Sequence, residues 1–164
     1  ATNVLRTGNK KAASLVLIGD VLKGVIVVLL TKDYVGETNA PYVLIPLSAL
    51  AVFLGHLFPV FFRFKGGKGV ATSAGVLFVL DPLLGGIAVL VWIVVAIVTR
   101  YSSLGALTSA LTTVIVSALT LRELSLVLVL MAIFILIVMK HRQNIKNLIS
   151  GDETKILFNP RSDC

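Results

Sequence analysis

Six apolar segments, separated by short polar stretches, make up most of this 164-residue chain. They span residues 14–31, 42–62, 70–80, 83–99, 104–121 and 124–139. A helix needs about 20 residues to cross a bilayer, so several segments are of marginal length and 70–80 is too short for a full crossing. The chain is 57% hydrophobic and 14% charged, with a mean hydropathy of +0.98, whereas about a quarter of the residues in soluble domains are charged. We therefore predict an all-α integral membrane protein, a polytopic helical bundle of about six membrane segments, some short, that forms a single membrane-embedded domain over residues 1–164.

Positive charge collects in three polar motifs, near residues 1–11, 63–72 and 140–155. The net charge is +7, and the basic residues lie at the ends of apolar segments, a pattern typical of membrane topology rather than of nucleic acid binding. The positive-inside rule places all three motifs in the cytoplasm. This arrangement requires an even number of segments after Lys68, so we predict that 70–80 is a helix of its own, separated from the next segment by Asp81-Pro82. The outer side would then include a loop at residues 32–41.

A glycine-rich, cationic loop directly follows the second apolar segment, where residues 64–70 read Phe-Lys-Gly-Gly-Lys-Gly-Val. Gly66, Gly67 and Gly69 would let backbone N–H groups approach an anion closely, and Lys68 would supply a mobile positive charge. The spacing differs from that of the nucleotide P-loop, which has four residues between its first glycine and the Gly-Lys pair, followed by Ser or Thr. The motif favours a site for phosphate or another anion at the bilayer surface. The alternative is a tight turn between two helices.

The other two motifs also contain residues suited to binding phosphate. In the first, Arg6 can hold phosphate oxygens in a bidentate fork, and Thr2 and Asn3 can complete the hydrogen bonding. The alternative is that the basic residues of this motif only fix orientation and contact anionic lipid. In the third, His141 and Asn144 are three residues apart and so share one face of a predicted amphipathic helix. The alternative there is an interfacial helix with a basic face.

Some polar residues are harder to assign from the sequence. Asp20 and Lys23 are three residues apart in the first apolar segment, where we expect a structural ion pair, with a proton relay as the alternative. His56 has no polar neighbour in the sequence, so we expect it to pack near the interface. Asp152 and Glu153 are expected to be solvated. With one cysteine and no cluster of metal-ligating residues, we expect neither a metal nor a cofactor.

Three stretches resemble, in order and spacing, the bacterial acyl-phosphate:glycerol-3-phosphate acyltransferase family, the PlsY-type membrane glycerol-3-phosphate acyltransferases. They are Ala-Thr-Asn-Val-Leu-Arg at 1–6, Gly-His-Leu-Phe-Pro at 55–59 with Phe-Lys-Gly-Gly-Lys-Gly-Val-Ala-Thr at 64–72, and Lys-His-Arg-Gln-Asn-Ile-Lys at 140–146. The resemblance covers essentially the whole chain. Family members begin with an additional membrane helix and a Ser-Gly-Asn-x-Gly stretch, so seven segments are expected in a complete member. This chain is expected to be an N-terminally incomplete version.

The resemblance implies a multi-pass enzyme of the bacterial plasma (inner) membrane whose motifs face the cytoplasm. It would transfer an acyl group from acyl phosphate to the 1-hydroxyl of sn-glycerol 3-phosphate, giving lysophosphatidic acid and phosphate in phospholipid biosynthesis, in contact with membrane lipids and without nucleic acid. Substrate binding is implied for Thr2, Asn3, Arg6, Gly66, Gly67, Lys68, Gly69, Thr72, His141 and Asn144. Catalytic roles are implied for His141, Lys68 and Arg6. Lys68 and Arg6 would hold phosphate groups, and either His141 or a substrate phosphate would act as the base.

Two other classes of function remain open on the sequence. A membrane transporter for phosphate esters or other anions would use the same cationic residues to form a vestibule. However, only Asp20 and Lys23 place charge along a path through the membrane, and no internal repeat is visible. A non-catalytic lipid-binding scaffold would leave the glycine loop unexplained.

Overall fold

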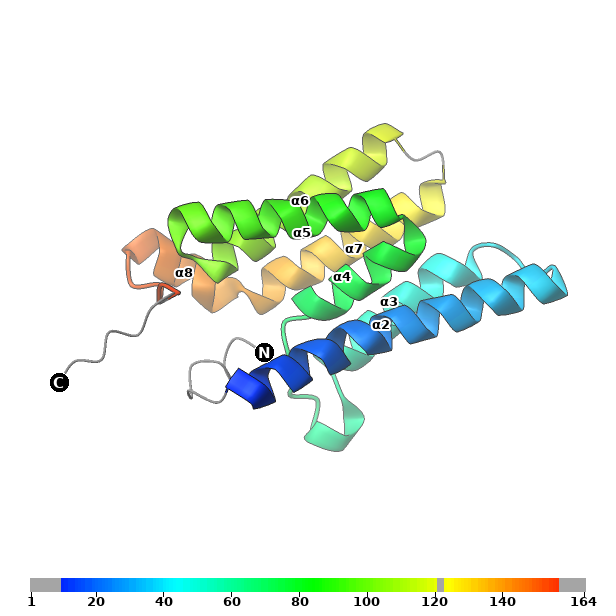
Figure 1. Ribbon diagram of the computed structural model, residues 1–164, viewed down its shortest axis with the longest axis horizontal. Coiled ribbons are helices and arrows are strands. Elements are labelled where there is room, and N and C mark those ends of the chain that lie inside the picture. The colour runs from blue at the N-terminus through cyan, green and yellow to red at the C-terminus, as the bar shows by residue number, and fades with distance from the viewer. Residues whose placement is uncertain (1–9, 121–122, 157–164) are drawn as a thin grey trace.

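The computed structural model describes residues 10–120 and 123–156, and within these ranges every regular element is helical (Figure 1). The elements are α2 (Lys10–Thr38), α3 (Leu44–Leu57), the short 3-10 helix η1 (Val60–Phe62), α4 (Val70–Leu80), α5 (Pro82–Thr99), α6 (Ser102–Thr120), α7 (Leu124–Lys140) and α8 (Arg142–Ser150). The predicted all-α class is confirmed, and the six predicted apolar segments correspond to α2 through α7.

The first helix is longer than its apolar segment predicted. α2 contains 29 residues and continues through Thr38, so most of the predicted outer loop at 32–41 is helical, and that expectation is wrong. Tertiary contacts explain the extension. Val35 packs against a buried apolar cluster, and Nζ of Lys32 donates a hydrogen bond to the carbonyl oxygen of Val79 at 3.2 Å.

The short helix α4 is separate from α5, as predicted. Asp81 is the N-cap of α5 and accepts a hydrogen bond from the backbone N–H of Leu84 at 3.0 Å, while Pro82 occupies the first turn. With 11 residues, α4 is about 16 Å long, roughly half the thickness of a hydrocarbon core. In the described ranges, α2, α3 extended through η1, α5 and α6 are long and apolar enough to cross a membrane, and α7 counts as a fifth when it is taken together with α8.

The helices form a ring. α2 packs against α3 and α4, α4 against α5, α5 against α6, α6 against α7, and α7 against α3. The α2–α3 and α4–α5 connections, the C-terminal end of α6 and the N-terminal end of α7 lie toward one end of the bundle, and the start of α2, the α5–α6 turn and the α7–α8 bend lie toward the other (Figure 1). Three buried apolar clusters, which include Leu130, Val76 and Phe53 respectively, hold the ring together. Many large apolar side chains are exposed, as expected for helices that contact lipid.

Small residues bring α5 and α6 close together. A Cβ on Gly105 would lie 2.9 Å from the carbonyl oxygen of Trp92, so only glycine allows this approach of α6 to α5. One turn further along α6, Ser109 Oγ donates a hydrogen bond to the carbonyl oxygen of Ala88 at 2.7 Å. Close packing through small and hydroxyl-bearing residues is common between membrane helices, and here it fixes the start of α6 beside the site described next.

Candidate active site

A cavity of about 540 Å³ lies inside the ring and is lined by residues from every helix from α2 to α8. The glycine loop, residues 66–69, forms part of its wall. Its other polar lining residues include Asp20, His56, Ser103, His141, Asn144 and Glu153. Its apolar lining includes Leu77, Phe78, Val89, Trp92, Leu130 and Phe134. The cavity therefore joins a cationic glycine loop to an apolar interior.

The glycine loop packs directly on the C-terminal half of α3. A Cβ on Gly66 would lie 2.7 Å from the carbonyl oxygen of Leu57, and a Cβ on Gly69 would collide with the ring of Phe53. Gly69 also has φ +83°, a conformation that favours glycine. Tight packing therefore accounts for part of the motif, in agreement with the alternative of a close turn, while the whole loop still faces the cavity.

A chain of hydrogen bonds joins the glycine loop to α8 and α6. Nζ of Lys68 donates to Oδ1 of Asn144 at 2.5 Å, and Nδ2 of Asn144 donates to Oε1 of Glu153 at 2.7 Å. Oγ of Ser103 donates to the same carboxylate oxygen at 2.6 Å. Since an ammonium group only donates and a carboxylate only accepts, both neighbours fix the same orientation of the Asn144 amide. The structure thus brings together Lys68 and Asn144, which lie 76 positions apart in the sequence.

Glu153 is part of this site, and the expectation that it is solvated is wrong. Glu153 is only 8% exposed. Burial alone would raise the pKa of the Glu153 carboxyl, but hydrogen bonds from Ser103, Asn144 and Asn147, together with the charge of Lys68, bring the pKa below its ordinary value. The group is therefore a carboxylate at neutral pH, and it holds Asn144 in place.

Sequence reasoning missed Glu153 because its position depends on a turn. The predicted amphipathic helix in this region is confirmed as α8, which ends at Ser150 and is followed by the C-cap residue Gly151 with φ +83°. The backbone N–H groups of Asp152 and Glu153 then donate to the carbonyl oxygen of Asn147 at 2.8 and 3.1 Å, which folds the chain back onto α8. The sequence does contain one signal for this turn, because Gly151 ends the predicted helix and two acidic residues follow it directly. Nothing in the local sequence marks Ser103, which comes from α6.

His141 lies at the bend between α7 and α8, whose axes differ by 59°, and it is 2% exposed. Its Nδ1 is 2.8 Å from the carbonyl oxygen of Ile137. A carbonyl only accepts, so Nδ1 carries the hydrogen and Nε2 of the neutral ring keeps a lone pair. Burial lowers the pKa of His141 and outweighs the hydrogen bond to Ile137, which alone would raise it. At neutral pH the ring can therefore accept a hydrogen bond or a proton from a hydroxyl group in the cavity.

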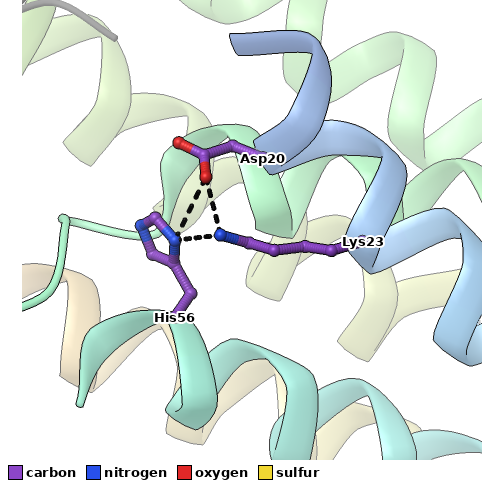
Figure 2. Close-up of polar contacts among 3 residues, drawn as sticks. All are labelled: Asp20, Lys23 and His56. Atoms are coloured by element: carbon purple, nitrogen blue, oxygen red, sulfur yellow. Dashed lines mark hydrogen bonds and ion pairs between the residues drawn. The ribbon is translucent and has the colours of Figure 1, made fainter. Parts of the chain in front are cut away.

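A second polar cluster lies on the α2–α3 side of the cavity and comprises Asp20, Lys23 and His56 (Figure 2). Nζ of Lys23 is 2.6 Å from Oδ1 of Asp20, so the predicted ion pair is present. The same Nζ contacts Nδ1 of His56, which lies 3.4 Å from the Asp20 oxygen. The expectation that His56 has only a packing role near the interface is therefore wrong. Its partners come from α2, 33 or more positions earlier, where the sequence around His56 could not show them.

The remaining predicted site residues are Thr2, Asn3, Arg6 and Thr72. Thr2, Asn3 and Arg6 lie outside the described residues. Thr72 is fully buried in α4 and does not line the cavity, and its Oγ1 has no hydrogen-bond partner in the described part of the chain. Its backbone lies against α2, since a Cβ on Gly24 would be 2.6 Å from the Thr72 carbonyl oxygen. Within the same described ranges, no group of three His, Cys, Asp or Glu residues is placed to hold a metal ion.

The fold and the cavity together define a polytopic membrane protein whose internal cavity joins a cationic glycine loop to an apolar lining. A family model described as glycerol-3-phosphate acyltransferase matches residues 1–151. A glycerol-3-phosphate acyltransferase of Nitrosomonas eutropha is 52% identical over 156 residues, which are 95% of this chain and 78% of that protein. Another, of Paraburkholderia phymatum, is 48% identical over 156 residues, 95% of this chain and 74% of that protein. The chain therefore belongs to the glycerol-3-phosphate acyltransferase family, a family of enzymes.

Solved structures agree with this assignment. The crystal structure of PlsY, an integral membrane glycerol 3-phosphate acyltransferase, in its glycerol 3-phosphate form matches with a TM-score of 0.88 and 35% identity, and the match covers 95% of this chain and 76% of that one. The lysophosphatidic acid form matches with a TM-score of 0.87 and 35% identity, over 95% of this chain and 78% of that one. The predicted membrane bundle and the family resemblance drawn from three sequence motifs are both confirmed.

Proposed function

We propose that this chain transfers an acyl group from acyl phosphate to the 1-hydroxyl of sn-glycerol 3-phosphate, which yields lysophosphatidic acid and inorganic phosphate for phospholipid biosynthesis. Membership of the family and the likeness to PlsY structures in glycerol 3-phosphate and lysophosphatidic acid forms support this reaction. The observation in this chain that carries the proposal is the cavity, where the glycine loop and a neutral histidine meet an apolar interior.

The polar end of the cavity suits phosphate. Lys68 supplies a positive charge, and Gly66, Gly67 and Gly69 bring backbone close to the cavity without side chains in the way. Asn144 lies within hydrogen-bond distance of Lys68 and adds a polar group to the same region. The sequence-based assignment of substrate binding to these residues remains part of the proposal, as does the participation of Thr2, Asn3 and Arg6.

The other end of the cavity suits an acyl chain. Phe78, Trp92, Leu130 and Phe134 line it, and they come from α4, α5 and α7. An acyl chain that enters between these side chains would replace its contacts with lipid by contacts with protein. Its reactive carbonyl would stay near the polar end of the cavity. This geometry places donor and acceptor in one cavity, which is the main requirement for a reaction between two bound substrates.

The chemistry needs no nucleophile from the protein, because acyl phosphate is already activated. The oxygen of the 1-hydroxyl attacks the acyl carbon, the bond from that carbon to the bridging phosphate oxygen breaks, and phosphate leaves with the electron pair. The hydroxyl proton passes to Nε2 of His141 or to a substrate phosphate oxygen, and it ends on the released phosphate. Lys68 would stabilise the negative charge that develops on the phosphate during the reaction.

The cellular setting is also part of the proposal. We place the chain in a bacterial inner membrane, and the positive-inside rule favours the orientation in which its three basic motifs face the cytoplasm. In that orientation glycerol 3-phosphate and acyl phosphate enter from the cytoplasmic side, and the lipid product leaves into the surrounding membrane lipids.

The test is to supply the chain in lipid with labelled glycerol 3-phosphate and, in separate reactions, acyl phosphate, acyl-CoA or acyl carrier protein. A second form, extended with the N-terminal segment of the Nitrosomonas eutropha relative, is assayed in parallel. We expect lysophosphatidic acid from acyl phosphate and from neither other donor. Absence of product from every donor with both forms, combined with uptake of labelled glycerol 3-phosphate into sealed vesicles, would replace this proposal with a transport function.

A further inference from the structure

The cluster of Asp20, Lys23 and His56 is not explained by the roles proposed so far. Two of its members, Asp20 and His56, line the same cavity as the glycine loop. The side chains of Asp20 and His56 are 19% and 12% exposed. Charged and polar groups at membrane depth are costly, and they usually face a functional cavity or a partner. An ion pair alone would satisfy Asp20 and Lys23, so the presence of His56 in the cluster calls for a separate explanation.

Lys23 determines which nitrogen of His56 carries the hydrogen. Its ammonium group contacts Nδ1 of His56 and, at 2.6 Å, Oδ1 of Asp20. An ammonium group only donates, so Nδ1 accepts from Lys23 and the hydrogen of the neutral ring is on Nε2. The longer separation of 3.4 Å between Nδ1 and the Asp20 oxygen agrees, because both atoms are acceptors in this arrangement.

The Nε2 atom of His56 faces the glycine loop. A Cβ on Gly67 would collide with Nε2 and Cε1 of the ring, so the imidazole fills the space where a side chain at position 67 would stand. Nε2 has no hydrogen-bond partner among the described residues. An N–H donor next to Lys68, on the wall of the same cavity, is therefore available to a ligand.

We propose that His56 is a further substrate-binding residue, whose Nε2–H donates a hydrogen bond to a phosphate oxygen held at the glycine loop. Lys23 is a positioning residue that keeps His56 in this tautomer, and Asp20 is a positioning residue that holds Lys23. The inference rests on the proposed function only in naming the phosphate. That phosphate belongs to either glycerol 3-phosphate or acyl phosphate, and both offer the same acceptor oxygens.

The test compares two substitutions that separate the two ring nitrogens. In His56→Asn the amide oxygen can accept from Lys23 in place of Nδ1, but no donor reaches the position of Nε2. In His56→Gln the longer side chain brings an N–H donor to that position. We expect kcat/KM to fall about 10- to 100-fold in His56→Asn, the usual range for a lost hydrogen bond to a charged group, and to be partly restored in His56→Gln. The loss should be in the KM for one substrate, and that substrate identifies the phosphate.

Lys23→Met and a matched control test the positioning role. Lys32 is another lysine of α2, it contacts the Val79 carbonyl oxygen instead of the cluster, and it does not line the cavity. We expect Lys23→Met to raise the same KM as His56→Asn does, by a smaller factor, and Lys32→Met to leave that KM unchanged.

A binding measurement makes the inference independent of turnover. Inorganic phosphate should raise the Tm of the wild-type chain in detergent, and His56→Asn should need about ten times more phosphate for the same increase. Equal phosphate dependence of the two proteins would overturn the inference, as would an unchanged KM for both substrates in His56→Asn. If the wild-type chain makes no lysophosphatidic acid yet shows this difference in phosphate binding, the proposed reaction fails and the His56 assignment stands.

Discussion

The two histidines of the chain line one cavity but present opposite hydrogen-bonding groups to it. On the α2–α3 side, Lys23 donates to Nδ1 of His56, which leaves an N–H donor at Nε2. At the α7–α8 bend, Nδ1 of His141 donates to the carbonyl oxygen of Ile137, which leaves an acceptor at Nε2. One histidine is therefore suited to hold an anion, and the other to accept the proton of a hydroxyl group. In each ring, the group that contacts Nδ1 determines whether Nε2 is a donor or an acceptor, so the residue type alone does not assign its chemistry.

Lys68 connects the two sides, so its replacement should have the largest effect. Lys68→Ala removes the charge of the glycine loop and the hydrogen bond to Asn144. We expect kcat/KM for acyl transfer to fall by about 10²- to 10³-fold or more, the usual effect of removing one group that stabilises developing charge. Lys65 is the matched control, because it is an exposed lysine of the same segment and does not line the cavity. Equal losses in Lys65→Ala and Lys68→Ala would show that only the overall charge of this segment matters.

His141→Asn tests the acceptor side of the comparison. The amide N–H can replace Nδ1–H at the Ile137 carbonyl, but no acceptor remains at Nε2. If His141 is the base, kcat should fall by about 10²-fold or more with little change in Tm. In the wild type, burial lowers the pKa of His141, so if His141 is the base, the fall in activity as Nε2 becomes protonated should be centred below the ordinary histidine pKa of 6.5. A near-normal kcat in His141→Asn, with the same acid limb, would assign the proton to a substrate phosphate.

Gly69→Ala tests whether the loop must lie close to α3. At φ +83° an alanine costs about 1–2 kcal/mol, and the collision with Phe53 adds to that cost, so we expect a clear drop in Tm. Gly86→Ala is the control, since a Cβ at that position in α5 meets nothing within 4 Å. A loop that tolerates alanine at 69 with unchanged Tm would contradict the packing described here.

Glu153→Gln should have the smallest effect, because the side chain keeps an oxygen that can accept from Ser103 and Asn144. The pKa of Glu153 is lowered in the folded protein, so the carboxylate adds stability above pH 4.5 that is lost as the pH falls through its folded value. Glu153→Gln should therefore remove part of the acid dependence of Tm, whereas Asp152→Asn, at an exposed neighbour, should not. Thermal denaturation in detergent between pH 3 and 7 makes the comparison.

The sequence predicted the features that depend on local patterns. Apolar runs and Asp81-Pro82 indicated the helices and the separate α4, and the spacing of Asp20 and Lys23 indicated their ion pair. It failed where a contact crosses the bundle. His56 needed α2, Glu153 needed the turn after Gly151 and a hydroxyl from α6, and residues 32–38 needed packing against α4 to stay helical. Such contacts depend on the tertiary arrangement, which the periodicity of one segment does not specify.

The most direct test of the account is an experimental structure of the chain with glycerol 3-phosphate bound. We predict that its phosphate lies at the glycine loop within hydrogen-bond distance of Lys68, that its 1-hydroxyl faces Nε2 of His141, and that the apolar part of the cavity stays open for the acyl chain. A phosphate bound outside this cavity, away from Lys68 and from both histidines, would contradict the central claim that one cavity holds the reaction.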